Sequence, residues 1–153
     1  MPKFRFRLKT LLKLRDAERD RRRRELAEAL RAEDVLQEQL QALRSEWEGL
    51  KDHYRQTAGP GTLDVDHLLA VQRYEVTLRS QQRLLGEQRA RLAEEIERRR
   101  QVLVAADRDV KILEKLRDHQ AERHRREEDR RGVLQLDEIA QQRAVAMMGG
   151  REP

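Results

Sequence analysis

Apolar residues recur along this chain with the spacing of a coiled-coil seam. In the first half they alternate in steps of four and three residues, at Leu36, Leu40, Leu43, Trp47, Leu50 and Tyr54. In the second half they repeat every seven residues, at Val71, Leu78, Leu85, Leu92, Ala106 and Leu113, with Arg99 as a polar interruption. Either spacing places an apolar stripe on one face of a helix, and such a stripe is buried against a partner helix.

The two stripes are separated by Gly59-Pro60-Gly61, the strongest helix-breaking sequence in the chain. Glycine and proline end a helix and let the chain reverse, so we predict that the second helix folds back on the first. The predicted fold class is all-α, with two long helices in an antiparallel coiled-coil hairpin and helix 2 longer than helix 1. We expect a single coiled-coil domain over residues 1–153, with helix 1 at about 6–56, a turn at 57–62, helix 2 at about 63–145 and a flexible tail at 147–153.

A hairpin that closes at Gly59-Pro60-Gly61 also predicts a register. Leu26 is expected to face the region of Leu92, and Leu8 is expected to face Val110. Helix 2 then has no partner beyond about Leu116, because helix 1 is shorter. A polar helix without a partner is marginal in water. We therefore predict that residues 117–131 are mobile in the isolated protein and become ordered on a partner.

The seam is expected to be thin near the turn. The second seam position of helix 2 is polar at Glu75, Gln82 and Arg89 but apolar at Ile96 and in the two heptads after it. Two facing helices cannot bury every large apolar side chain near the turn, so some of the few aromatic residues are expected to be exposed there. Trp47 and Tyr54 have two interpretations: packing in the seam, or an exposed anchor for a partner protein.

Composition supports this shape and restricts the function. Charged residues make up 41% of the chain and aromatic residues 3%, whereas globular domains average about 25% charged residues. Disorder is the competing interpretation of so polar a chain, but the periodic leucines favour the hairpin. The absence of cysteine excludes disulfides and thiolate chemistry. No segment resembles a signal peptide or the ~20 apolar residues of a membrane span, so we expect a cytoplasmic protein without a direct membrane span.

The net charge of +5 is concentrated at the N-terminal end, where the first 24 residues hold eleven Lys or Arg residues and three acidic ones. The run at 15–24 has three interpretations: a solvated helix face, an electrostatic docking surface for a protein, or a basic helix that enters the major groove ahead of a leucine zipper. Asp16, Glu18 and Asp20 lie inside the run and would meet phosphates. We therefore expect no nucleic acid as partner.

The sequence contains no catalytic constellation. His119 and His124 are five residues apart, so they point away from each other on a helix and cannot share a metal. Acidic residues such as Asp107 precede a basic residue by four positions, which is typical of surface ion pairs. Gly59-Pro60-Gly61 lacks the pattern of a phosphate-binding loop. We predict a protein that is not an enzyme and holds no cofactor and no metal.

Three segments resemble a known family. The opening Phe4–Arg15, FRFRLKTLLKLR, resembles the start of the flagellar export protein FliJ family. Val110–Arg117, VKILEKLR, resembles its C-terminal signature, and Leu136–Ala140, LDEIA, resembles its closing motif. The order and spacing of these motifs, the length and the basic N-terminus agree with the family across essentially the whole chain.

The resemblance implies a cytoplasmic component of the flagellar type III export apparatus, held peripherally at the inner membrane. Family members are antiparallel coiled coils similar to the stalk of the rotary ATP synthase gamma subunit. They promote assembly and activity of the export ATPase ring, contact the export-gate protein FlhA and bind export chaperones. By position, the gate-binding face maps to Leu43, Trp47, Leu50, Tyr54, Tyr74, Leu78, Gln81 and Leu85.

The leading hypothesis is therefore a monomeric, non-enzymatic coupling rod of the export apparatus. The candidate ATPase contacts are Arg15, Arg19, Arg21, Arg22, Arg23 and Arg24. Two alternatives stay open: a nucleic-acid-binding coiled coil that uses the basic N-terminal helix, and a generic scaffold coiled coil.

Overall fold

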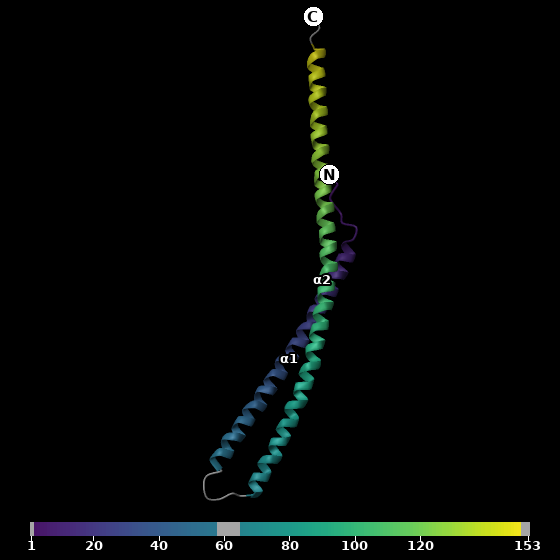
Figure 1. Ribbon diagram of the computed structural model, residues 1–153. Helices are drawn as coiled ribbons and strands as arrows, with labels where there is room; N and C mark the ends of the chain where they lie inside the picture. Colours follow the sequence, from purple (N-terminus) through teal and green to yellow (C-terminus); the bar gives the residue numbers. More distant parts are fainter. Residues whose placement is uncertain (1, 58–64, 151–153) are drawn as a thin grey trace. The chain divides into compact units, whose positions relative to one another are not determined.

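Two long helices make up the fold. The computed structural model describes residues 2–57 and 65–150, which contain α1, Lys9–Thr57, and α2, Val65–Gly149 (Figure 1). No strand occurs in these two ranges. The predicted fold class, two helices in an antiparallel hairpin with the second helix longer, is confirmed. The predicted turn at 57–62 lies outside the described residues except for Thr57, which ends α1.

The ends of the helices follow from local backbone contacts. Before α1, Lys9 N–H donates to Phe6 C=O at 3.3 Å, and Leu12 N–H donates to Leu8 C=O at 2.9 Å. These contacts start the first turn of α1. At the other end of the chain α2 continues to Gly149, so the first residues of the segment expected as a tail are helical.

Packing divides the chain into two compact units, Arg19–Ala106 and Met1–Glu18 with Asp107–Pro153. In the first unit the C-terminal part of α1 lies beside the N-terminal part of α2 (Figure 1). Its buried side chains are all apolar: Ala29, Leu40, Leu78, Ile96 and Ala106. Three of these belong to the two stripes on which the hairpin was predicted, so the heptad pattern identifies the seam correctly.

The register of this unit differs from the expected one. The guanidinium of Arg99 donates through Nη1 to the backbone C=O of Glu25, so the neighbouring Leu26 lies near Arg99 rather than near Leu92. Nearer to the helix ends at Thr57 and Val65, Tyr74 Oη donates a hydrogen bond to Glu46 Oε2 with a length of 3.0 Å. α1 ends later and α2 begins later than expected for a turn centred on Gly59. This moves each α1 residue opposite a later α2 residue.

The seam thins toward Thr57 and Val65, as predicted. Leu40 and Leu78 are the last buried side chains in that direction. Beyond them Leu43, Trp47 and Leu50 are half-buried, and Tyr54 and Tyr74 are exposed. The prediction that some aromatic residues near the turn are exposed is confirmed.

The second unit contains the N-terminal segment, the start of α1 and the C-terminal part of α2. Leu12 and Val110 are its buried side chains. Arg15 Nη1 lies 3.6 Å from Asp109 Oδ2, so Val110 sits at the level of Arg15 rather than Leu8. The shift has the same direction as in the first unit.

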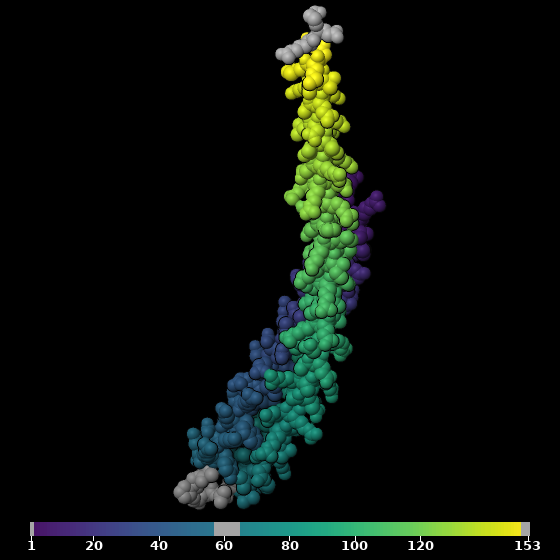
Figure 2. Space-filling model, turned by 45° about the horizontal axis from the view of Figure 1, so that its top comes forward, coloured from purple at the N-terminus to yellow at the C-terminus, as the bar shows by residue number. Residues whose placement is uncertain are grey.

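The expectation that α2 has no partner beyond about Leu116 is wrong. The ring of Phe4 lies 5.8 Å from the ring of His124, centroid to centroid, and a ring nitrogen of His124 lies 3.2 Å from the backbone oxygen of Pro2. The extended residues before α1 therefore continue along α2 where helix 1 was expected to leave it bare. From Val133 onward the described residues of α2 are all exposed, as the yellow end in Figure 2 shows.

None of the described helices combines the length and the apolar composition that a membrane span requires.

Candidate protein-binding surface

Trp47 lines two cavities on the described part of the hairpin. Its side chain is half-buried at the edge of the thin part of the seam. Lys51 Nζ lies over the indole ring at 5.2 Å from the centroid, and Arg79 Cζ lies over it at 5.5 Å. Cations at this distance are attracted by the negative face of the ring. Arg79 is also held by Glu75, with an Nη2–Oε1 distance of 2.8 Å.

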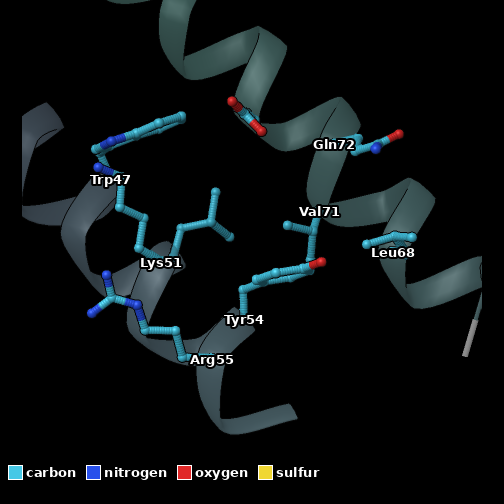
Figure 3. Close-up of a pocket in the computed structure, with 9 residues that line it drawn as sticks. Trp47, Lys51, Tyr54, Arg55, Leu68, Val71 and Gln72 are labelled. Atoms are coloured by element: carbon cyan, nitrogen blue, oxygen red, sulfur yellow. The ribbon is translucent and has the colours of Figure 1, made fainter. Parts of the chain in front are cut away.

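A cavity of about 360 Å³ opens between the two helices next to Trp47. In Figure 3 the ring of Tyr54 lies beside Val71, with Lys51 on the α1 side and Leu68 on the α2 side. Opposing side chains are too far apart here to close the seam, which is why a cavity forms. The full lining is Trp47, Leu50, Lys51, Tyr54, Arg55, Leu68, Val71, Gln72 and Glu75.

A second, smaller cavity of about 190 Å³ shares Trp47 and Lys51 with the first. It extends the hollow toward the buried Leu78. Its lining is Leu43, Arg44, Trp47, Glu48, Lys51, Leu78 and Gln82. The two cavities adjoin at these two shared residues. We call them together the Trp47 groove and define it by the lining residues of both.

The eight candidate gate-binding residues do not all lie in this groove. Five of them line it, namely Leu43, Trp47, Leu50, Tyr54 and Leu78. Gln81 and Leu85 instead line a separate cavity with Gln39, Ala42, Leu43 and Leu84.

 Tyr74 lines none of these three cavities. Leu78 is only 3% exposed and so is a seam residue. The spacing that grouped the eight residues therefore spreads them over the seam, the groove and a second surface.

Tyr74 is held by a carboxylate across the hairpin. Its hydrogen bond to Glu46, together with the negative charge of that carboxylate, raises the pKa of the Tyr74 hydroxyl above its ordinary value of 10.0. The folded protein thus holds this proton more tightly than the unfolded chain does. The resulting stability is fully present below pH 10.0 and is lost as the pH rises through the raised pKa.

We predict that Tyr74→Phe removes the part of the pH dependence of folding stability that comes from the Tyr74 hydroxyl. The wild-type chain should lose stability relative to the variant as the pH rises above about 10, because only the wild type carries the titrating hydroxyl. Urea unfolding followed by circular dichroism at a series of pH values measures the difference. A difference between the two proteins that stays constant through this range would contradict the role of the Glu46 contact.

The basic run at 15–24 is interleaved with carboxylates. Arg22 Nη1 lies 3.1 Å and Arg21 Nε 3.6 Å from oxygens of Glu25. Arg19 and Arg23 lie 3.5 and 3.9 Å from Asp20. Arg21 and Arg23 are exposed, whereas Arg19 and Arg22 are half-buried. Ion pairs at the surface contribute about 0–1 kcal/mol each. The candidate ATPase contacts are therefore spread along the helix with their acidic neighbours, and Arg15 pairs with Asp109 instead.

Arg99 is a residue that the heptad pattern marked only as a defect. It donates from Nε to Glu95 Oε1 at 2.9 Å and from Nη1 to the backbone of Glu25. The long side chain thus spans the seam where an apolar residue was expected. The signal in the sequence was the interruption itself, opposite the part of helix 1 that is poor in apolar residues.

The histidines and carboxylates are placed as follows. His53 and His67 meet across the hairpin with ring centroids 5.5 Å apart, and His124 contacts the N-terminal segment. The residues that the structure describes contain no group of three or more side chains arranged to hold a metal. Asp107 pairs with Lys111 at 2.9 Å, as its spacing predicted.

Comparison with known proteins agrees with this architecture. The model of one family, described as flagellar FliJ protein, matches residues 4–148. No curated protein and no solved structure matches the chain. The family match covers both helices and all three segments on which the resemblance rested. The chain therefore belongs to the flagellar FliJ protein family.

Proposed function

We propose that this member of the flagellar export apparatus is a coupling protein between the export ATPase and the export gate. In this proposal it promotes assembly and activity of the ATPase ring, contacts FlhA and binds export chaperones, and it catalyses no reaction itself. It acts as a single-domain monomer at the cytoplasmic face of the inner membrane. The observation that carries the proposal is the family match over residues 4–148, and the Trp47 groove supports it by offering a surface for a second protein.

The gate contact is assigned to the Trp47 groove. Aromatic residues that are half-buried and surrounded by apolar side chains dominate the energetics of protein interfaces. Trp47 meets this description on α1. The half-buried Leu50 and the exposed Tyr54 line the same cavity beside it. Gln81 and Leu85 line a separate cavity, and Tyr74 lines none of the three cavities, so their contribution to the same contact is tested separately.

We expect Trp47→Ala to weaken binding to the cytoplasmic part of FlhA roughly tenfold or more and to reduce motility, because it removes the central ring of the groove. Tyr74→Ala is expected to have a smaller effect. Pull-down with purified FlhA fragment and swimming assays measure both. Val76→Ala, an exposed apolar residue outside the groove, is the control. Equal effects of Trp47→Ala and Val76→Ala would contradict the assignment.

The ATPase contact is assigned to the basic run at 15–24. Charges on an exposed helix attract an oppositely charged surface and lose this effect in salt. Replacement of Arg21, Arg22, Arg23 and Arg24 by Gln is expected to lower stimulation of the ATPase several-fold at low salt, with less effect at high salt. The matched control replaces Arg83, Arg89, Arg91 and Arg98 by Gln.

Two outcomes of this experiment count against the ATPase assignment. One is unchanged stimulation by the variant at low salt. The other is salt-sensitive retention of the wild-type chain on DNA that the same replacements abolish, which would favour the nucleic-acid alternative.

A further inference from the structure

We infer that the Trp47 groove binds a peptide segment that inserts an apolar side chain and carries acidic residues on either side of it. The inference rests on the proposed function in one respect, because it describes the chemistry of the partner segment at the surface assigned to the gate. The groove itself and its charges are properties of this chain alone.

The apolar part of the groove accepts a side chain. Leu50, Leu68 and Val71 line the larger cavity together with the ring of Tyr54. Its volume of about 360 Å³ lies at the lower end of the range for ligand sites. An inserted apolar side chain would complete the packing that the thin seam leaves open. The hydrophobic free energy gained in this way is non-directional and roughly proportional to the apolar area removed from water.

The charges of the groove select acidic neighbours for that side chain. Four cations belong to the groove or lie over its tryptophan, namely Arg44, Lys51, Arg55 and Arg79. Two carboxylates accompany them, Glu48 and Glu75. The excess is positive, so carboxylates of the partner find attractive positions beside Trp47.

A single-stranded nucleic acid fits the groove less well, although it also combines flat apolar groups with negative charge. Stacking of bases requires accessible ring faces, and Lys51 and Arg79 already lie over the ring of Trp47. Glu48 and Glu75 would also repel phosphates. Apart from Trp47 and Tyr54, the apolar lining of the larger cavity consists of the branched aliphatic side chains of Leu50, Leu68 and Val71, which offer no further ring for a base to stack on.

Trp47 is the one tryptophan of the chain, so its fluorescence reports directly on the groove. The full-length protein is titrated with a synthetic peptide that carries a leucine flanked by glutamates. One comparison peptide replaces the glutamates with lysines, a second replaces the leucine with serine, and oligo(dT) is a third probe. We expect a saturable change in emission with the leucine–glutamate peptide that weakens as salt rises. The three other probes should bind roughly tenfold more weakly or not at all.

The variant Lys51→Gln with Arg55→Gln is expected to lose most of this preference for glutamates. The matched control is Arg73→Gln with Arg83→Gln, which removes two cations of α2 outside the groove. Circular dichroism confirms that both variants keep the helicity of the wild type. Equal binding of the lysine peptide, tighter binding of oligo(dT), or no saturable binding of the leucine–glutamate peptide would overturn the inference.

These results are separable from a failure of the proposed function. If the peptide binds as expected but Trp47→Ala leaves FlhA binding intact, the gate assignment fails and the groove chemistry stands. If Trp47→Ala abolishes FlhA binding and the peptide does not bind, the gate assignment stands and the inference fails.

Discussion

Val110→Asp is expected to unfold the unit formed by the start of α1 and the C-terminal part of α2. Val110 is 0% exposed and is one of two buried side chains described in that unit. A carboxylate at this fully buried position would lose its hydration, which costs several kcal/mol, or would force the helices apart; the nearby Arg15 is half-exposed and already pairs with Asp109. We expect a loss of about 3–5 kcal/mol in the free energy of unfolding. Thermal and urea unfolding followed by circular dichroism measure it.

The matched control is Ile112→Asp, two positions further along α2. Ile112 is 64% exposed, so the same chemical change there removes little packing and is expected to cost less than about 1 kcal/mol. Similar losses for the two variants would show that α2 does not present the face containing Val110 to α1.

Leu78→Ala is expected to have the second largest effect, in the other unit. Leu78 is 3% exposed and lies where the well-packed part of the seam ends. Truncation of a buried leucine removes apolar contacts and leaves a cavity, at a cost of about 2–5 kcal/mol. We expect the lower end of this range, because the adjoining cavity already leaves Leu78 fewer neighbours on one side. Unfolding in urea, followed by circular dichroism, measures the loss.

Leu84→Ala, at a residue that is 56% exposed, is the control for this change. The comparison also separates two roles of Leu78. A seam residue changes stability in the absence of any partner, whereas a contact residue changes affinity for FlhA at constant stability. A variant with wild-type stability and weakened FlhA binding would contradict the seam role.

The fold was predictable because the two stripes use residues whose burial follows from their period. Leu40, Leu78 and Ala106 lie at predicted seam positions and are buried. The register was not predictable from the Gly-Pro-Gly sequence alone, because it depends on where each helix ends. The register follows instead from side chains that reach across the seam, such as Arg99, which donates a hydrogen bond to the backbone C=O of Glu25. The contact of Phe4 with His124 was missed because the residues before α1 carry no helical pattern.

The candidate site was only partly predictable. The spacing correctly indicated that Trp47 and Tyr54 lie on one face of α1, beside an incompletely packed seam. It did not separate groove residues from others on the same helices, so Tyr74 and Gln81, which do not line the groove, were grouped with Trp47. The placement of Arg79 over the indole ring depends on the register between the helices, which the periodicity of one helix does not contain.

The central claim is that one chain folds back on itself into an antiparallel hairpin. Because the chain has no cysteine, spin labels can be attached selectively after Ala42→Cys and Leu84→Cys, two positions that line one cavity between α1 and α2. The labelled protein is diluted with unlabelled protein so that only distances within one chain are measured. In an antiparallel hairpin the two labels lie a short distance apart. A distance near 60 Å, roughly that of the two helices continuing in one direction, would contradict it.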